Sequence, residues 1–315
     1  MSIGIKKPRL IALVGPTASG KTALSIRIAR FLNSNAAKKR FGIAGSEIIS
    51  ADSRQVYRGM DIGTGKITRK EMGGIPHHLL DVASPTKNFT VTNYQRLAKR
   101  AIKAILAKHK IPIICGGTGF YIDAALYDYA LPEVKANPKL RRMLEMRSAE
   151  ELFKRLEQLD PERAKYIDRH NKRRLIRALE IIDATKKPVP SREEALRKES
   201  AYDILKIGVA LTPEKLKENI HKRLLARMRQ GMVAEVRRLK AQGVSSHRLE
   251  NLGLEYRFVN RYLDDRLTKL QMLGELEKAI RQYTKRQMTW FRPDMHTHWI
   301  TKKNEAIKII DGFLE

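Results

Sequence analysis

Short apolar runs alternate with amphipathic stretches through the first part of the chain. The apolar run from Arg9 to Gly15 is followed by helical spacing of Ala, Leu and Ile from Ala23 to Phe31. A second run, Glu47 to Ala51, and a third, Ile111 to Cys115, are separated by an amphipathic stretch from Asn93 to Lys108. This alternation is typical of strands that are connected by helices. The pattern therefore predicts an α/β protein with a parallel sheet flanked by helices.

Small or polar residues follow each of these three predicted strands. Gly15 comes after the first strand, Asp52 after the second and Gly116 after the third. In parallel α/β sheets, ligands bind beyond the carboxyl ends of the strands. We therefore expect the three segments to meet at one crevice.

The pattern changes between about Tyr127 and Ser200, where charged helical periods continue without strand-like runs. Beyond this region, an apolar run from Ile204 to Leu211 predicts another core strand. Thr212-Pro213 predicts the start of a helix, because proline is tolerated in a first helical turn. We therefore expect three parts: the first part of a core domain (1–127), an all-helical insertion (128–200), and a mainly helical and basic completion of the core (201–315).

A glycine-rich segment after the first predicted strand matches the pattern G-x-x-x-x-G-K-[ST] at every position. Its glycines allow backbone N–H groups to surround a pyrophosphate, and the start of the following helix adds positive potential. Lys21 can neutralise phosphate oxygens, and Thr22 can ligate Mg²⁺. The pattern predicts a P-loop NTPase-like phosphate site without specifying ATP. The predicted phosphate-binding residues are Gly15, Pro16, Thr17, Ala18, Ser19, Gly20, Lys21 and Thr22.

The composition adds a strong charge imbalance. The chain has 63 Lys+Arg against 34 Asp+Glu, a formal net charge of +29. This excess favours a polyanionic partner, although a solvated basic surface has the same composition. The apolar runs are far shorter than the roughly 20 residues that span a bilayer, and the first residues lack the features of a secretion signal. We therefore expect a cytoplasmic protein without a membrane segment.

The P-loop by itself makes a kinase or an ATPase the default interpretation. Asp52 could act as a base or ligate Mg²⁺ through water, or it could simply cap a helix. After the third strand, glycines permit close approach of the backbone to a ligand and Thr118 offers a hydroxyl, but a plain tight turn explains the same residues. These residues alone leave the reaction open.

Taken together and in order, several segments resemble the tRNA dimethylallyltransferase (tRNA isopentenyltransferase) family. They are GPTASGKTALS, SADSRQVYRGMDIGTGK, IPHHLLD, GGTGFYIDAAL, NKRRLIRALEI, RMRQGMVAEV and KRQMTWFR. The similarity extends from the first predicted strand to the last predicted helix. One segment, Leu252 to Tyr256, departs from the I-G-Y-K-E that is usual in bacterial members, which leaves the contacts near Gly253 open.

The resemblance implies that the P-loop holds dimethylallyl pyrophosphate and that ATP is not consumed. The implied acceptor is the N6 amine of the adenosine on the 3′ side of the tRNA anticodon, with Asp52 as the general base for this amine. Thr118 would hydrogen-bond the bridging oxygen of the leaving pyrophosphate. Lys21, Arg223 and Thr22 with Mg²⁺ would stabilise the negative charge on that group.

The resemblance also implies a wide contact with the anticodon stem-loop, because the target adenine must leave a stacked loop. Basic residues are concentrated from His221 to Lys240 and from Lys172 to Arg177, although solvated helix faces have the same pattern. We expect tRNA binding to weaken steeply with salt and one chain to act as a monomer. The expected tRNA contacts are Asp52, Ser53, Arg54, Gln55, Thr118, Arg141, Arg173, Arg174, Leu175, Ile176 and Arg177.

The alternatives belong to other functional classes. An adenylate isopentenyltransferase shares the P-loop and the base but prenylates free AMP, ADP or ATP; the net charge and the insertion favour a larger polyanion. A small-molecule or nucleotide kinase would transfer phosphate from labelled ATP. A non-catalytic RNA-binding module would leave tRNA unchanged in the presence of the donor.

Overall fold

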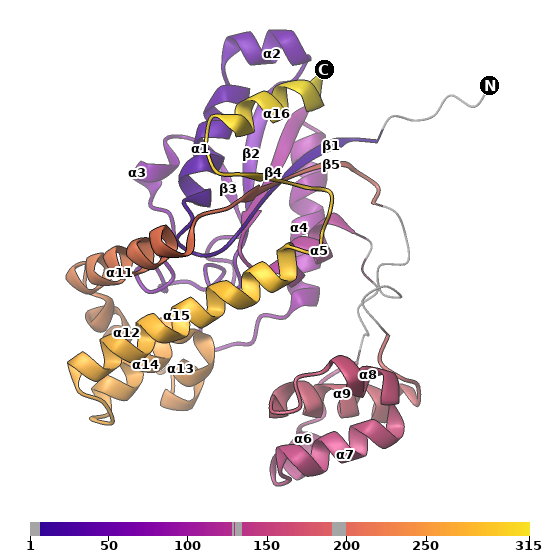
Figure 1. The fold of residues 1–315 in the computed structure, drawn as a ribbon, viewed down its shortest axis with the longest axis vertical. Helices are drawn as coiled ribbons and strands as arrows, with labels where there is room; N and C mark the ends of the chain where they lie inside the picture. Colours follow the sequence, from indigo (N-terminus) through magenta and orange to yellow (C-terminus); the bar gives the residue numbers. More distant parts are fainter. Residues whose placement is uncertain (1–6, 128, 130–133, 191–199) are drawn as a thin grey trace. The chain divides into compact units, whose positions relative to one another are not determined.

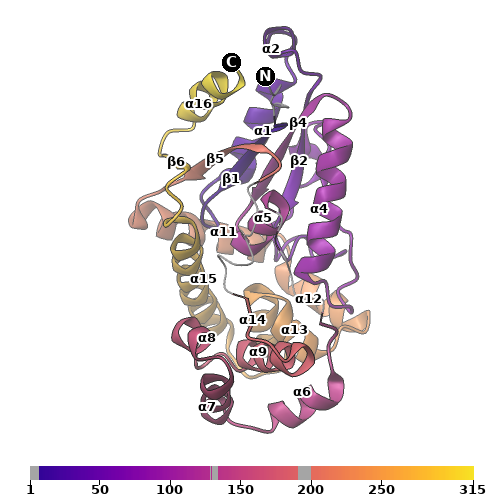
Figure 2. The ribbon, with the colours of Figure 1, turned by 90° about the vertical axis from the view of Figure 1, so that its right-hand side faces the viewer.

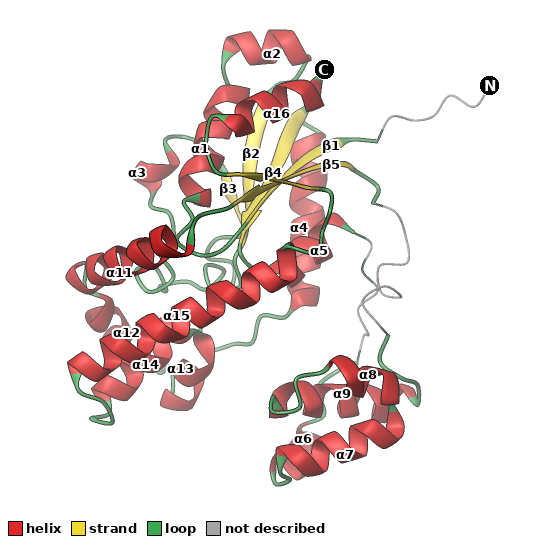
Figure 3. Cartoon of the chain, viewed as in Figure 1, coloured by secondary structure: helices red, strands yellow, loops and turns green. Residues whose placement is uncertain are grey.

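The computed structural model describes residues 7–127, 129, 134–190 and 200–315. Its centre is a six-stranded sheet in the order β3-β2-β4-β1-β5-β6, and the described pairings are all parallel (Figures 1 and 3). The strands are β1 (Arg9–Val14), β2 (Gly45–Ala51), β3 (His77–His78), β4 (Lys110–Gly116), β5 (Asp203–Val209) and β6 (Thr297–Ile300).

Helices cover both faces of this sheet. On one face α1 (Lys21–Leu32) and α16 (Glu305–Leu314) contribute to a single hydrophobic cluster with the strands. On the other face α4 (Val91–Leu106) packs against β2 and β4 and against α5 (Gly119–Leu126). Figure 2 shows α4 and α16 on opposite sides of the strands. The short helices α2 (Asn35–Phe41) and α3 (Arg69–Met72) contribute Phe41 and Met72, which pack against the same cluster as α1 and α16.

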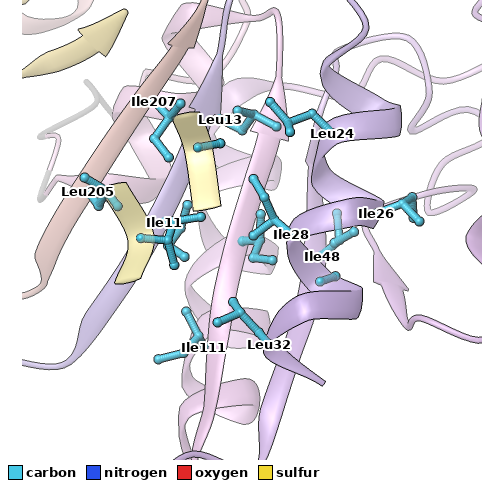
Figure 4. Packing of buried hydrophobic residues seen from close by; sticks show 14 of the residues in the cluster. Ile11, Leu13, Leu24, Ile26, Ile28, Leu32, Ile48, Ile111, Leu205 and Ile207 are labelled. Carbon is cyan, nitrogen blue, oxygen red and sulfur yellow. The ribbon is translucent and has the colours of Figure 1, made fainter. Parts of the chain in front are cut away.

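The central strand β1 is buried on both faces. Ile11 and Leu13 pack against Leu24 and Ile28 of α1 (Figure 4), while Leu10, on the alternate face, is also fully buried. A strand that is covered on both sides has a continuous apolar sequence instead of an alternating one. This is the physical reason that the central strands could be recognised from short apolar runs.

Further helices gather beyond the carboxyl ends of the strands (Figure 1). Two of them bond to loops that follow strands: Glu235 of α12 to the loop after β2, and Gln287 of α15 to the loop after β1. Thr212 caps α11 and Pro213 stands in its first turn, as the sequence predicts. These helices are α11 (Pro213–Arg229), α12 (Met232–Ala241), α13 (Ser246–Leu252), α14 (Leu254–Leu263) and α15 (Lys269–Phe291).

The chain divides into two compact units. The core unit comprises Met1–Leu126 and Ser200–Glu315, and the helical unit comprises Tyr127–Glu199. The helical unit has a hydrophobic cluster of its own, in which Leu152 and Leu156 pack with Leu175. Its described helices are α6 (Pro138–Glu145), α7 (Ala149–Leu159), α8 (Pro161–Tyr166) and α9 (Lys172–Thr185).

The predicted fold class is confirmed, with two strands added. The sequence pattern did not indicate β3 or β6, which form the two edges of the sheet. Both are short, with two and four residues, so neither produces a recognisable apolar run. The strand predicted to end at Leu211 ends at Val209. Within the described ranges, every helix is too short or too polar to cross a membrane.

Candidate active site

The three loops predicted to meet do lie side by side. β2, β4 and β1 are neighbours in the sheet, with Ala51 paired to Gly116 and Leu13 to Cys115. The segments after these strands border a cavity of about 1060 Å³. Its walls include Lys21, Thr22, Asp52, Gln55, Gly117, Arg223, Arg227, Tyr283 and Gln287.

The glycine-rich loop holds its shape through contacts with α11. Ala18 has a positive φ of 62°, which costs a residue with a side chain of the order of 1 kcal/mol or more. The carbonyl of Ala18 accepts a hydrogen bond from Asn219 Nδ2 at 3.1 Å, and Arg223 Nη1 donates to Thr17 Oγ1 at 3.4 Å. Two side chains of α11 therefore stabilise the conformation of the loop.

Lys21 and Arg223 bring two positive charges to the cavity. Lys21 is buried, and its ammonium donates to the Pro16 carbonyl and to Ser19 Oγ. Burial and the nearby charge of Arg223 lower the pKa of Lys21 to about 8, although the charge of Asp52 acts in the opposite direction. Burial and the nearby Arg227 lower the pKa of Arg223 to about 10. The lowered pKa values mean that the surroundings disfavour the charged forms of both side chains. A bound anion would offset this unfavourable free energy.

Asp52 both caps a turn and faces the cavity. Its Oδ1 accepts hydrogen bonds from the backbone N–H groups of Arg54, at 2.8 Å, and Gln55, at 3.3 Å. The carboxylate thus caps a turn, where the sequence allowed a helix cap, and it also lines the cavity. Thr118 Oγ1 accepts from the Ser53 N–H at 3.1 Å, which ties the β4 loop to the Asp52 loop.

A buried carboxylate that the sequence did not suggest organises the loop after β2. Glu235 accepts hydrogen bonds from three successive N–H groups, those of Asp61, Ile62 and Gly63, at 2.7 to 3.0 Å. It also accepts one from the Tyr256 hydroxyl at 2.8 Å. Three converging amides and a phenol compensate the burial of this negative charge.

The same loop passes close to a second arginine. Arg227 is buried and pairs with Glu255 at 2.8 Å. A Cβ on Gly65 would lie 2.1 Å from Arg227 Nη2 and 2.3 Å from Arg223 Nη2, so a side chain there would displace both guanidinium groups. The φ of 57° at Gly65 also favours glycine. The segment Leu252 to Tyr256, which departs from the usual family sequence, therefore supplies two contacts of the site: Glu255 to Arg227, and Tyr256 to Glu235.

Helix α15 contributes Tyr283 and Gln287, one turn apart. Gln287 bonds to the backbones of Thr17 and Gly117, and Tyr283 approaches the Thr118 side chain. Burial raises the pKa of Tyr283 to about 12. Both residues lie in or next to the segment KRQMTWFR, and their spacing of four residues places them on one face of the helix. The sequence does not show which loops that face contacts.

The oxygen atoms at the cavity fit a diphosphate-bound Mg²⁺. Thr22 is exposed at the start of α1 and, like Asp52, lines the cavity. A hydroxyl and a carboxylate are ligands that Mg²⁺ accepts alongside substrate phosphates. Among the described residues, no cluster of three or more His, Cys, Asp or Glu side chains could hold a metal without such a substrate.

The four arginines of the helical unit that are expected to contact tRNA differ in their surroundings. Arg173 and Arg174 are exposed. Arg141 and Arg177 both bind the buried carboxylate of Glu180, with N–O distances of 2.7 and 2.6 Å.

Leu175 and Ile176 require a correction. They are 0% and 6% exposed and belong to the hydrophobic cluster of the helical unit. Their side chains therefore pack the unit and offer no surface to RNA.

The comparisons agree with this geometry. The fold and the glycine-rich loop define an α/β protein of the P-loop class. Residues 55–294 match the model of the family described as IPP transferase. The tRNA dimethylallyltransferase of Anoxybacillus flavithermus is 39% identical over 300 residues, which cover 95% of this chain and 92% of that protein. The chain belongs to the IPP transferase family, as the resemblance of its motifs predicted.

Two further relatives extend the agreement over nearly the whole chain. The tRNA dimethylallyltransferase of Bacillus subtilis is 38% identical over 323 residues, covering 98% of both proteins. The crystal structure of a tRNA delta(2)-isopentenylpyrophosphate transferase from Staphylococcus epidermidis is 35% identical, with a TM-score of 0.69 over 97% of this chain and 99% of that one.

Proposed function

We propose that the protein transfers a dimethylallyl group from dimethylallyl pyrophosphate to the N6 amine of the adenosine on the 3′ side of the tRNA anticodon. Family membership supports the class of reaction. One observation in this chain carries the assignment: the cavity holds Lys21 and Arg223, which have no carboxylate partner among the described residues, together with the Asp52 carboxylate. It thus combines an anion site with a base.

The proposed reaction is a displacement at carbon. The N6 nitrogen forms a bond to C1 of the dimethylallyl group while the bond from C1 to the bridging oxygen breaks and pyrophosphate leaves. Asp52 takes the proton that the amine releases. Because two backbone N–H groups already hold its Oδ1, the carboxylate has a fixed orientation, which favours proton transfer from a positioned substrate.

Stabilisation of the departing pyrophosphate is assigned to the residues around the glycine-rich loop. Backbone N–H groups of Gly15–Thr22, apart from that of Thr17, would surround the phosphates, and Lys21 and Arg223 would neutralise their charge. Thr118 would donate a hydrogen bond to the bridging oxygen. When bound through Thr22, Mg²⁺ would offset part of the charge that develops on the phosphate oxygens.

Recognition of tRNA is assigned to both units. The net charge of +29 suits a polyanion, and the loop Asp52–Gln55 lies where an extruded adenine would meet the base. In the helical unit we assign the main phosphate contacts to Arg173 and Arg174. We assign weaker phosphate contacts to Arg141 and Arg177, because both already pair with Glu180. Because tRNA is the proposed substrate, we place the protein in the cytoplasm. We also expect the protein to act as a monomer.

The test offers one donor to several acceptors. We expect prenylation of an anticodon stem-loop, detected by mass spectrometry of its nucleosides, and little or none of AMP. Faster turnover on AMP would make the protein an adenylate isopentenyltransferase, and phosphoryl transfer from labelled ATP would make it a kinase. A stem-loop that binds but stays unmodified would refute catalysis.

A further inference from the structure

Gln287 joins two loops of the candidate active site. The residue lies on α15 and is 5% exposed. Its Oε1 accepts a hydrogen bond from the Thr17 N–H at 2.8 Å, and its Nε2 donates to the Gly117 carbonyl at 2.8 Å. Thr17 belongs to the glycine-rich loop, and Gly117 directly precedes Thr118. One amide therefore ties the two loops together.

We propose that Gln287 is a positioning residue, which fixes the distance between the glycine-rich loop and the Thr118 turn. In this role it allows Lys21 and Thr118 to act on the same leaving group. The inference rests on the proposed function, because it concerns the same reaction. Groups of a catalytic site must be held to within about 0.5 Å, and a displacement of about 1 Å can reduce a rate by roughly 10²-fold.

Only a primary amide satisfies both partners. The Thr17 N–H needs an acceptor and the Gly117 carbonyl needs a donor; a carboxylate could only accept, and a thioether donates nothing. The fit is also close, since a Cβ on Gly117 would lie 2.2 Å from Gln287 Nε2. The contact is therefore direct, without room for a side chain at position 117.

Tyr283 supports the same turn from the same helix. Its side chain approaches that of Thr118, and it lines the cavity beside Gln287. α15 therefore meets the turn at two points: Gln287 bonds to the carbonyl of Gly117, and Tyr283 approaches the side chain of Thr118. The Thr118 hydroxyl also contacts Ser53, so the turn lies between α15 and the Asp52 loop.

The hydrogen bond to Thr17 also predicts which quantity a substitution of Gln287 should change: the transfer rate or the affinity for pyrophosphate. Because Gln287 already engages the Thr17 N–H, this group is not among the donors that a diphosphate would use. Removal of the amide should leave the phosphate donors in place and disturb the position of Thr118. The transfer rate should therefore fall while pyrophosphate still binds.

The experiment compares Gln287→Met with Gln282→Met. Gln282 is exposed on the same helix, so the control makes the same chemical change away from the cavity. Single-turnover transfer to an anticodon stem-loop and the Kd for pyrophosphate are measured for both, together with Tm. We expect the rate of Q287M to fall roughly 10²-fold and its pyrophosphate Kd to stay within about threefold, with Q282M like the unmodified chain.

Two results would overturn the inference: a Q287M rate within about threefold of the unmodified chain, or equal losses of rate and pyrophosphate affinity. If Q287M does not fold, Q287E, which keeps an acceptor for Thr17, is judged by the same criteria. An unmodified chain that transfers no prenyl group refutes the proposed function, and the inference with it. A functional chain with an unimpaired Q287M refutes the inference alone.

Discussion

The core unit and the helical unit hold their cations in different ways. Beside the cavity of the core unit, Lys21 is buried and Arg223 is half-buried, and the described part of the chain gives them no carboxylate partner. In the helical unit, Arg141 and Arg177 share the carboxylate of Glu180. Other arginines there, Arg173 and Arg174, are simply exposed.

Under the proposed function, this difference would distinguish the binding of a small anion by the core unit from the attraction of a large anion by the helical unit. A buried cation without a partner carries an unfavourable free energy that a bound anion relieves, so each such residue contributes strongly to binding. An exposed arginine keeps its hydration and is screened by salt, so its individual contribution is small. We therefore expect single substitutions to have large effects in the core unit and small effects in the helical unit.

Replacement of Asp52 should have the largest effect. Asp52→Ala should reduce the transfer rate roughly 10²- to 10⁴-fold, the usual contribution of a general base. The Kd for pyrophosphate should hardly change, because the cations that bind it are intact. Single-turnover transfer to a stem-loop and titration with pyrophosphate measure the two quantities.

Asp52→Asn is the matched control for the capping role of Asp52. The Asn Oδ1 can still accept the N–H groups of Arg54 and Gln55, while the amide cannot take a proton from the substrate. The Asn variant should be as slow as the Ala variant. Near-normal turnover of either would show that another group removes the proton.

Lys21→Met should have the next largest effect. The loss of a buried charge that contacts the diphosphate should weaken pyrophosphate binding by about 10²-fold, equivalent to roughly 2–3 kcal/mol. Isothermal titration measures this change. Lys222→Met is the control, since Lys222 also borders the cavity but is exposed; equal effects of the two substitutions would contradict the distinction between buried and exposed cations.

The glycine-rich loop could be predicted from the sequence, whereas its supports could not. The loop is a contiguous pattern, so its residue spacing carries the geometry. Gln287 and Glu235 act through side chains whose partners are 270 and 172 residues away, and no local pattern identifies such a pair. Arg227 could have been found, because it stands four residues after Arg223 and therefore on the same helical face.

The prediction for α9 was wrong for a related reason. A continuous contact segment from Arg173 to Arg177 is incompatible with helical periodicity, which turns some of these residues inward. Leu175 and Ile176 are those residues, and they pack the core of the helical unit. A hydrophobic pair between arginines on a helix indicates the buried side, which the sequence alone could have shown.

Removal of the shared carboxylate tests the helical unit. Glu180 also accepts the Asn137 N–H at 2.7 Å, so Glu180→Gln should weaken several charged hydrogen bonds and reduce the stability of this unit by roughly 2–3 kcal/mol. Hydrogen exchange of the α9 amides in the full chain measures the change. Glu162→Gln, at an exposed pair with Lys165, should change little. If the α9 amides are equally protected from exchange in both variants, Glu180 does not contribute to the stability of the helical unit.

The pH dependence of pyrophosphate binding should report Lys21. Its pKa of about 8 in the free protein means that affinity falls as pH rises through 8, by at most about tenfold per unit. The unfolded chain holds this proton up to about 10.5, so the stability of the unliganded protein should rise with pH between these values. Lys21→Arg should lose both trends relative to the unmodified chain. A profile that the substitution leaves unchanged would assign the titration to another group.

The smallest effects should come from the exposed arginines. Arg173→Ala and Arg174→Ala should each weaken stem-loop binding by about threefold near physiological salt and lower the slope of log Kd against log salt by about one. Pyrophosphate binding and the rate at saturating stem-loop should not change, because neither residue belongs to the cavity. Lys154→Ala, which removes a cation that already pairs with Glu150 on α7, should leave the slope as it was. If the arginine variants also keep the original slope, RNA does not contact this face of the helical unit. A loss as large as that expected for Lys21 would instead mean that the helical unit, too, recognises a single phosphate in a fixed position.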